Sequence, residues 1–384
     1  MIYCIPYLLL TAFFGGLSVY VETDGRESVR RYVNMVCIGV LLVFFGFRGY
    51  IMDDWISYYP AYQKCSWDYV NFNIFEYDIS WGFEPGFTLL MMLCKTVSED
   101  YQFLVFVCSL INTTLLFTFF KSRTDNFPFA IVLFLCFGGF VMNTNLLRNS
   151  ISILLFVNSL QYITDKKPLQ FFALNLLGLS FHVSSLIYFP LYFLLNRNYT
   201  VWVWGAVFLV ANVVFLLHIP ILVSFMELLL GDSEGRLQMM AASYTSGNMD
   251  EMKTFSVGYI ERLFTGILVL CYYNKLCGMR KEGVIFINSY LLYIAMSFFL
   301  SEFSEISLRM SNLFIFAYWI MWKDMTEVFS IENNRKLFMG FVCIYCALKM
   351  VGTTNLITAD YDNVLFGAKS YEERLYIHNR YSKN

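Results

Sequence analysis

The chain has 384 residues, of which 58% are hydrophobic and 15% are charged, and its mean hydropathy is +0.55. A soluble domain cannot cover that much apolar surface, so the composition excludes an ordinary globular protein and predicts an all-α polytopic membrane protein. The net charge of −2 and the pI of about 6.0 give no basic field, which argues against nucleic acid as a partner.

The cysteines and histidines indicate no metal site. The ten cysteines lie mostly inside apolar runs, and the three histidines stand far apart at positions 182, 218 and 378. No glycine-rich phosphate loop is present either, so we expect neither a metal nor a cofactor. The N-terminus is apolar from residue 2 and has no basic residue ahead of that run, which is typical of a retained first span rather than a cleaved signal.

Apolar runs that can cross about 30 Å of hydrocarbon, some only with the help of tilt, recur along the chain. They predict about twelve transmembrane helices in one domain, 1–352, followed by a polar tail, 353–384. The predicted crossings are 2–20, 32–47, 101–120, 127–142, 149–163, 169–181, 183–195, 201–217, 257–273, 284–300, 310–322 and 337–351. The shorter apolar segment 84–97 opens with Glu and Pro, which predicts a half-helix at the outer face.

Lysines and arginines predict the orientation, because they collect in alternate links at 26–31, 121–123, 166–167, 197, 275–281 and 323–336. These links are therefore predicted to be cytoplasmic. The long segments 48–100 and 218–256 contain few basic residues and are predicted to face outward. Both termini then fall outside, an arrangement that the moderately basic tail fits least well.

Unusual ionisable residues cluster at the predicted outer ends of the spans. They are Arg48, Asp53, Asp54, Glu84, Arg148, His182, Glu302, Glu305 and Arg309. A charge at membrane depth costs roughly 2.5 to 3.5 kcal/mol, so each such residue is a functional candidate. Each also has a simpler explanation, such as an interfacial salt bridge, a helix-start charge or a snorkelling arginine. Their convergence on one face is what indicates a site.

Other residues near this face have weaker claims. Trp55, Tyr58, Tyr59 and Trp81 stand close to the charges and could stack on sugar rings. Glu261 and Arg262 form either an internal pair or a lesser part of the site.

Several arginines at an outer membrane interface suit a lipid-linked diphosphate, because the guanidinium fork binds phosphate oxygens bidentately and keeps its charge. Positive charge there would also stabilise the negative charge that develops as a glycosidic bond to phosphate breaks. A carboxylate or His182 could remove the proton of an acceptor sugar hydroxyl.

Five stretches carry a family resemblance: "FGFRGYIMDDWISYYPAY", "WGFEPGFTLLMML", "LLRNSISILLFVNSLQYITDKK", "LGLSFHVSSLIYFPLYFLL" and "SEISLRMSNLFIF". In order and spacing they resemble the successive motifs of the EpsG-like branch of Wzy-type polysaccharide polymerases. The resemblance covers the chain up to about the eleventh predicted span. It implies a GT-C-like glycosyltransferase architecture in the bacterial inner membrane and a role in capsule, exopolysaccharide or O-antigen assembly.

Such polymerases transfer a growing glycan from undecaprenyl diphosphate to an incoming lipid-linked repeat unit, and we expect this without a metal. A chain-length regulator and a flippase are the further partners implied. The resemblance assigns the diphosphates to Arg48, Arg148 and Arg309, and acceptor positioning or proton removal to His182, with Asp54 or Glu84 as alternatives. Two departures are that Asn149 stands where the family often has Gln, and that Asp53 beside Asp54 leaves the choice of aspartate open.

Three other functions compete with this one. An O-antigen ligase-like enzyme would use the same donor and another acceptor. A transporter or flippase of lipid-linked glycans would place charges along a path through the bilayer. A non-catalytic subunit would tolerate alanine at His182 and Arg148.

Overall fold

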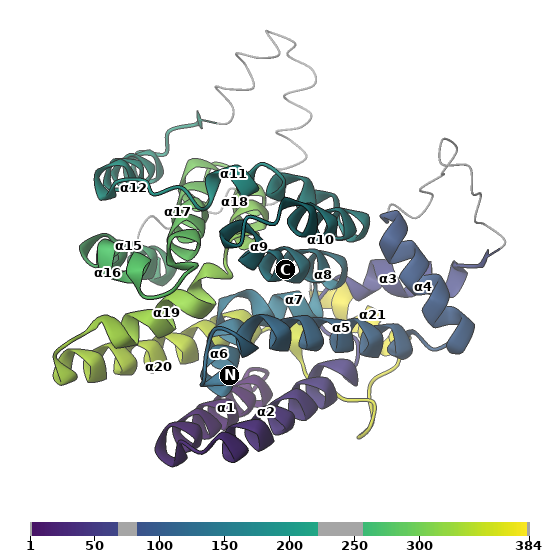
Figure 1. Cartoon of the computed structure of the whole chain (residues 1–384). Coiled ribbons are helices and arrows are strands. Elements are labelled where there is room, and N and C mark those ends of the chain that lie inside the picture. Colours follow the sequence, from purple (N-terminus) through teal and green to yellow (C-terminus); the bar gives the residue numbers. More distant parts are fainter. Residues whose placement is uncertain (1, 68–82, 222–255, 382–384) are drawn as a thin grey trace, which may run out of the picture. The chain divides into compact units, whose positions relative to one another are not determined.

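The computed structural model describes residues 2–67, 83–221 and 256–381, without the side chains of residues 304 and 305. Across these ranges the chain is helical, and its β-structure is limited to isolated bridges (Figure 1). The all-α prediction is therefore confirmed. The chain divides into two compact units, Met1–Tyr192 with Ser330–Asn384, and Phe193–Phe329.

The first unit holds most of the helices. They are α1 (Ile5–Asp24), α2 (Glu27–Leu41) with η1 (Leu42–Gly46), α3 (Trp55–Lys64), α4 (Pro85–Val97), α5 (Tyr101–Lys121), α6 (Phe127–Phe134), η3 (Leu135–Gly139), α7 (Phe140–Thr144), α8 (Leu147–Ser159), α9 (Gln161–Thr164), α10 (Pro168–Phe181), η4 (Val183–Tyr188), α11 (Leu191–Leu194, which ends in the second unit), α20 (Glu332–Thr354), η5 (Ile357–Ala359) and α21 (Tyr371–Tyr381). The second unit holds α12 (Val201–Leu216), α15 (Val257–Cys271), α16 (Tyr273–Gly278), α17 (Gly283–Phe299), α18 (Ser304–Asn312) and α19 (Ala317–Val328).

Five helices in the described part of the chain are long and apolar enough to cross a membrane: Ile5–Asp24, Glu27–Gly46, Tyr101–Lys121, Phe127–Thr144 and Glu332–Thr354. Shorter apolar helices match several of the other predicted crossings. Some predicted crossings are interrupted in the structure: for example, 183–195 comprises η4 and α11, and 310–322 is divided between α18 and α19. Hydropathy measures apolar content, so it did not reveal these breaks. The count of about twelve crossings stays a prediction.

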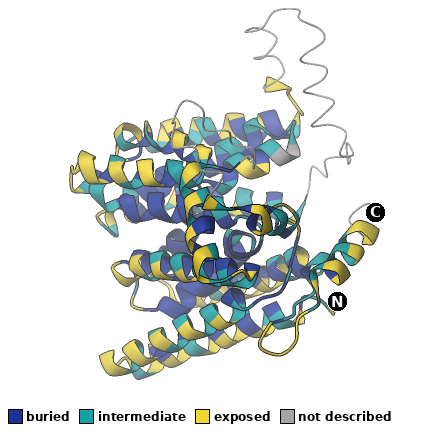
Figure 2. Cartoon of the chain, turned by 90° about the vertical axis from the view of Figure 1, so that its right-hand side faces the viewer, coloured by how far each residue is buried: buried dark blue, intermediate teal, exposed yellow. Residues whose placement is uncertain are grey.

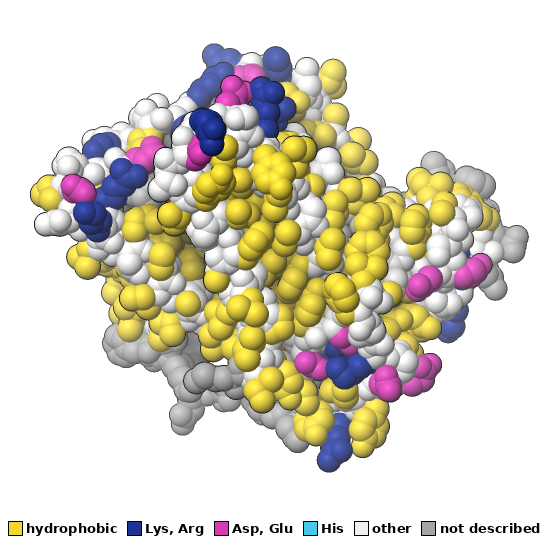
Figure 3. All heavy atoms as spheres, turned by 90° about the horizontal axis from the view of Figure 1, so that it is seen from below, with side chains coloured by type: hydrophobic (Ala, Val, Ile, Leu, Met, Phe, Trp, Pro, Cys, Tyr) yellow, Lys and Arg dark blue, Asp and Glu magenta, His cyan; other side chains and the backbone are white. Residues whose placement is uncertain are grey.

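The long helices expose apolar side chains on their outer sides. In α1 and α20, for example, Leu9 is 65% exposed and Leu337 is 76% exposed. Buried residues line the inner sides of the same helices (Figure 2). On the face seen in Figure 3, hydrophobic side chains cover a broad area and charged side chains gather near its margins. This is the surface expected of a protein surrounded by lipid.

The end of the first unit that is predicted to be cytoplasmic contains basic links in contact with each other. Arg30, just after the turn between α1 and α2, pairs with Asp125 at 3.5 Å. Asn126 donates to the hydroxyl of Ser18 near the end of α1 at 2.9 Å. Gly25 makes the turn itself possible, since it ends α1 with a φ of 69°. The links predicted to share a membrane side therefore meet in space.

At the other end, the C-terminal residues 355–381, here called the C-terminal strap, fold back along the chain after α2. The N–H of Val364 donates to the carbonyl of Phe47 at 2.8 Å, and the N–H of Met52 donates to that of Thr358, also at 2.8 Å. The phenol of Tyr7, near the N-terminus, donates to the carbonyl of Ala359 at 2.7 Å. Both termini of the first unit thus lie beside the segment that follows Gly46.

Candidate functional site

An ion pair between Arg148 and Glu84 brings together helices that are far apart in the sequence (Figure 1). Arg148 lies in the first turn of α8, and its Nη1 is 2.5 Å from Oε2 of Glu84, the residue that precedes α4. Its Nε donates to the phenol oxygen of Tyr58 on α3 at 3.2 Å. The guanidinium carbon lies 4.5 Å from the centre of the Phe83 ring. The paired side chains keep 19% and 17% of their surface exposed, so they are accessible to a ligand.

Tyr58 is a buried contact of this pair. Its ring is 4% exposed and stacks on Phe83, with 5.2 Å between the ring centres. Burial raises the pKa of Tyr58 to about 12, and the charge of Arg148 opposes part of that rise. The phenol therefore keeps its proton at neutral pH while it accepts the hydrogen bond from Arg148. A buried ring in this position is a support for Arg148 rather than an open platform for sugar.

Close packing between α4 and α10 places Glu84. The second carboxylate oxygen, Oε1, accepts the backbone N–H of Val183 at 3.0 Å, directly after α10. A Cβ on Gly86 would lie 2.7 Å from the carbonyl oxygen of Ser180 and 2.3 Å from its hydroxyl. Only glycine allows this approach, so Gly86 is needed for Glu84 to bridge Arg148 and Val183.

His182 sits beside this bridge and has its own supports. Its Nδ1 accepts the backbone N–H of Ser184 at 3.2 Å and lies 2.8 Å from the hydroxyl oxygen of the same serine. The Ser184 hydroxyl donates to Oδ1 of Asn149 at 3.0 Å. Asn149 follows Arg148 on α8, so the arginine and the histidine are linked through neighbouring residues. Because Nδ1 accepts the backbone N–H of Ser184, the backbone and the hydroxyl of Ser184 together fix the orientation of the imidazole ring.

Arg48 has a different environment from the one expected. It is 1% exposed, and it donates to the carbonyls of Asn143 at 3.0 Å, Thr144 at 3.2 Å and Gly49 at 3.1 Å. Asn143 and Thr144 end α7, where carbonyls lack partners within the helix and attract positive charge. This placement favours a structural role for Arg48 over the predicted contact with a diphosphate.

The two adjacent aspartates are held by Asn145, in the link between α7 and α8. Oδ1 of Asn145 accepts the backbone N–H groups of Asp53 at 2.9 Å and Asp54 at 3.1 Å. The Asp53 carboxylate is exposed and lies 3.1 Å from Nε2 of His378 in the C-terminal strap. Asp54 is half-buried directly before α3. The structure thus ties the aspartates to the chain that carries Arg148.

The other aromatic candidates pack inside the first unit. Trp55 is 2% exposed, and its indole nitrogen donates to the carbonyl of Met52 at 2.8 Å. Tyr59 stacks on Tyr371 of the C-terminal strap, with ring centres 4.1 Å apart. Trp81 lies outside the described residues.

The late charges belong to the second unit. Arg309 is an exposed residue of α18, and Glu302 is half-buried just before that helix. The side chain of Glu305 lies outside the described part. Their grouping with Arg148 stays a prediction.

Glu261 and Arg262 each contact tyrosines of the same unit. The buried Glu261 carboxylate accepts from Thr265 at 2.8 Å and from the Tyr318 phenol at 3.3 Å. The Nε of Arg262 donates to the phenol of Tyr293 at 3.1 Å. These contacts support an internal, structural cluster for the two residues.

The structure adds residues to the site that the sequence did not predict. Ser184, Asn145 and Phe83 are small or common residues that no charge pattern marks. Ser184 does follow His182 by two residues, a spacing that favours a local hydrogen bond between side chain and backbone. Among the described residues, no three His, Cys, Asp or Glu side chains gather closely enough to hold a metal ion.

Comparison with known proteins supplies a family and no closer relative. No curated protein and no solved structure matches the chain. A sequence model of the EpsG family matches residues 31–365, which include Arg48, Glu84, Arg148, His182 and Arg309. Since that match extends over most of its length, the chain belongs to the EpsG family.

Proposed function

We propose that this EpsG-family protein is a Wzy-type polysaccharide polymerase of the bacterial inner membrane, acting at its outer face. It transfers a growing glycan from undecaprenyl diphosphate to a lipid-linked repeat unit, with a GT-C-like helical architecture and with capsule, exopolysaccharide or O-antigen as the product. Membership of the family supports polymerisation in general. The single observation that carries the proposal is the accessible Arg148–Glu84 pair next to the supported imidazole of His182.

Arg148 is suited to bind the donor diphosphate. A guanidinium has five N–H donors, so it can hold Glu84 and Tyr58 while it contacts phosphate oxygens. Its contacts with Tyr58 and Phe83 fix its plane, which makes bidentate binding specific. As the bond from the anomeric carbon to phosphate oxygen breaks, the diphosphate takes the electron pair and Arg148 stabilises the added negative charge.

Glu84 neutralises the positive charge of Arg148, so binding of a diphosphate requires a further cationic side chain. Arg309 is the residue we propose for that role. Arg48 instead holds the end of α7 and the segment that carries Asp53 and Asp54.

His182 is the preferred base for the acceptor. The hydroxyl oxygen of the incoming sugar attacks the anomeric carbon, and its proton passes to the imidazole. Ser184 and Asn149 hold the imidazole ring in place. Both oxygens of Glu84 already accept hydrogen bonds, from Arg148 and from Val183, so this carboxylate is engaged in holding its neighbours. Asp54 is the remaining alternative.

The test is to delete the gene in its native host and to resolve the polyprenyl-linked glycans by mass. The deletion strain is complemented with the wild type, with Arg148→Ala and with Arg148→Lys. We expect single repeat units to accumulate on the carrier and only the wild type to restore polymer, because a lysine ammonium cannot replace the planar fork. Immunoblots of membranes check that all three proteins are present.

The other functions give different lipid pools. A ligase-like enzyme would leave full-length polymer on the carrier after deletion. A flippase would leave repeat units that external enzymes cannot reach in intact spheroplasts. Normal polymer in the Arg148→Lys strain would refute the role of Arg148 in binding the diphosphate.

A further inference from the structure

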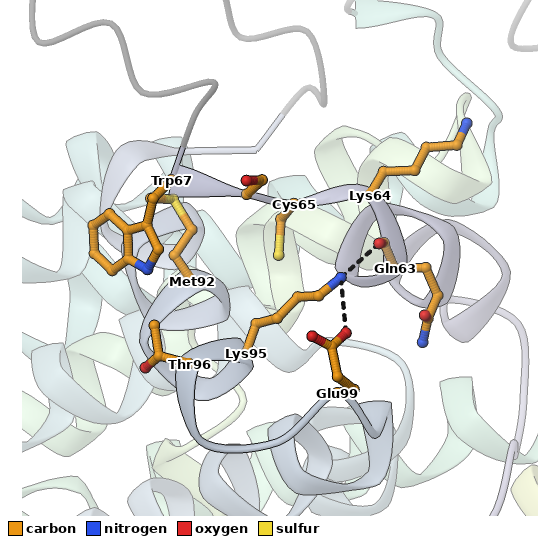
Figure 4. Close-up of a pocket in the computed structure, with 9 residues that line it drawn as sticks. Gln63, Lys64, Cys65, Trp67, Met92, Lys95, Thr96 and Glu99 are labelled. Atoms are coloured by element: carbon orange, nitrogen blue, oxygen red, sulfur yellow. Dashed lines mark hydrogen bonds and ion pairs between the residues drawn. The ribbon is translucent and has the colours of Figure 1, made fainter.

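A cavity of about 500 Å³ opens at the C-terminal ends of α3 and α4, away from the Arg148–Glu84 pair (Figure 4). The residues of its lining that matter for binding are Gln63, Lys64, Trp67, Lys95, Thr96 and Glu99. Its size lies within the range of small-molecule sites in proteins, roughly 300 to 1,000 Å³.

The walls of this cavity are held in place by contacts between the two helix ends. The Lys95 ammonium donates to the carbonyl of Gln63 at 2.6 Å and to that of Tyr62 at 3.1 Å, and it lies 3.5 Å from the Glu99 carboxylate. The phenol of Tyr62 donates to the carbonyl of Ser98 at 2.8 Å. Helix-end carbonyls that would otherwise lack partners are thus satisfied by the neighbouring helix. The cavity is therefore preformed.

The lining combines an aromatic face with polar groups. Trp67 lies on one side of the cavity with 44% of its surface exposed, and Gln63 and Glu99 lie on the other side of Lys95 (Figure 4). Gln63 both donates and accepts hydrogen bonds, Glu99 accepts and Lys64 donates. A sugar ring needs this mixture, because its hydroxyls donate and accept while its C–H face packs on an indole. A lipid chain would leave the polar walls unpaired.

The same two helices connect the cavity with the proposed catalytic centre. Tyr58 on α3 and Glu84 at the start of α4 contact Arg148, whereas the cavity lies at the other end of each helix. At a rise of 1.5 Å per residue, the stretch from Glu84 to Lys95 spans about 16 Å. A glycan whose reacting end lies near Arg148 could extend along the helices to Trp67.

We propose that this cavity is a saccharide subsite, which binds a sugar of the glycan at a distance from the reacting end. The inference rests on the proposed function. Binding there holds the polymer between transfers, so the cavity sets how many repeat units are added before release. Trp67 supplies the stacking face, and Gln63 and Glu99 supply the hydrogen bonds.

The test measures binding and product length in the full-length protein. Purified protein in detergent is titrated with the repeat-unit oligosaccharide released from the host's own polymer, and binding is followed by calorimetry. Losing an aromatic contact is worth about a tenfold change in affinity, so we expect about a tenfold higher Kd for Trp67→Ala and a near-normal Kd for Trp67→Phe. Trp202→Ala is the matched control, because Trp202 is also exposed, at 83%, and belongs to α12 of the second unit and not to the cavity lining.

In cells, Trp67→Ala and Glu99→Gln should shorten the polymer, whereas Trp202→Ala should not. An unchanged Kd and an unchanged polymer length for both cavity variants would overturn the subsite. If Trp202→Ala shortened the polymer as much as Trp67→Ala, the indole would be an interfacial anchor instead. The Arg148→Ala strain separates the two proposals, since normal polymer in that strain would refute the proposed function whatever the cavity variants do.

Discussion

Asn149 and Ser184 lie between the two side chains that the proposed mechanism uses, Arg148 and His182. The hydrogen bond from Ser184 to Asn149 leaves the Ser184 oxygen facing Nδ1 of His182, at 2.8 Å. A neutral amide at the end of this chain supports the imidazole without adding charge. We infer that these two residues position His182.

Asn149→Asp tests this role through the pH dependence of polymerisation. A carboxylate at position 149 stabilises the imidazolium, so His182 stays protonated up to a higher pH and cannot accept a proton there. We expect the acidic limb of the pH–rate profile to move to higher pH, measured in membrane vesicles supplied with lipid-linked repeat units. Ser184→Ala should interrupt the chain and abolish this shift in the double variant. If Asp54 is the base instead, the acidic limb will stay where it is in the wild type.

The site depends on the close packing of α4 against α10. Gly86→Ala would force a Cβ to within 2.7 Å of the Ser180 carbonyl oxygen, so the two helices must move apart. We expect a loss of roughly 1 to 3 kcal/mol of stability, seen as a lower Tm in detergent, together with a loss of polymer. Gly39→Ala on α2 is the control, since nothing lies within 4 Å of a Cβ there. Equal Tm values for the two variants would show that the contact at Gly86 is dispensable.

The C-terminal strap is a second element on which the site depends. Arg374 on α21 is 2% exposed; its Nη2 lies 2.8 Å from the Asp362 carboxylate and donates to the carbonyl of Asp360 at 2.6 Å. Asp362 also packs closely on Gly49, next to Arg48. The strap therefore holds the segment that leads to Asp53 and Asp54.

Arg374→Gln should release the strap, because it removes the buried guanidinium from the Asp362 carboxylate and leaves there the backbone N–H of Lys369 at 2.9 Å and its ammonium at 4.0 Å. The expected cost is about 3 kcal/mol, measured as the change in Tm of the purified protein. Limited proteolysis should then cut the C-terminal residues faster than in the wild type. Arg380→Gln is the matched control on the exposed side of the same helix. Unchanged proteolysis of Arg374→Gln would show that the strap is held by its other contacts alone.

For the whole molecule, the sequence predicted where helices lie and which charged residues are candidates better than it predicted what those residues contact. Loop charge placed the links at 26–31 and 121–123 on one side, and the pairing of Arg30 with Asp125 shows that these two parts of the chain are neighbours. The burial of Arg48 was missed because its partners are backbone carbonyls at the end of α7, and that end follows a break at Gly138, where φ is 91°. Side-chain composition gives no information about such a backbone partner.

The fold of the C-terminal strap was missed for a related reason. A polar, charged tail resembles a solvated segment, and its main-chain hydrogen bonds to Phe47 and Met52 leave no mark in composition. The same contacts bear on the part of the predicted topology that the basic tail fits least well. They place the tail beside the N-terminus and the segment of Arg48, which the loop charges predict to lie on the outer side.

This arrangement predicts the side of the membrane on which the C-terminus lies. Because the strap bonds to the chain after η1, both must lie on one side, and the basic links at Arg30 and Asp125 must lie on the other. The positive-inside rule makes the strap side the outer one. We expect alkaline phosphatase fused after Asn384 to be active and green fluorescent protein at the same place to stay dark.

An epitope inserted at Lys166, in a link predicted to be cytoplasmic, is the control. It should react with antibody only after the membrane is permeabilised. If the C-terminal fluorescent fusion is bright while the epitope at Lys166 reacts only after permeabilisation, the strap, and with it Arg48 and Asp54, faces the cytoplasm. The proposed chemistry would then have to occur before the lipid-linked repeat unit is flipped, so the sidedness of the C-terminus decides where Arg148 can meet its substrate.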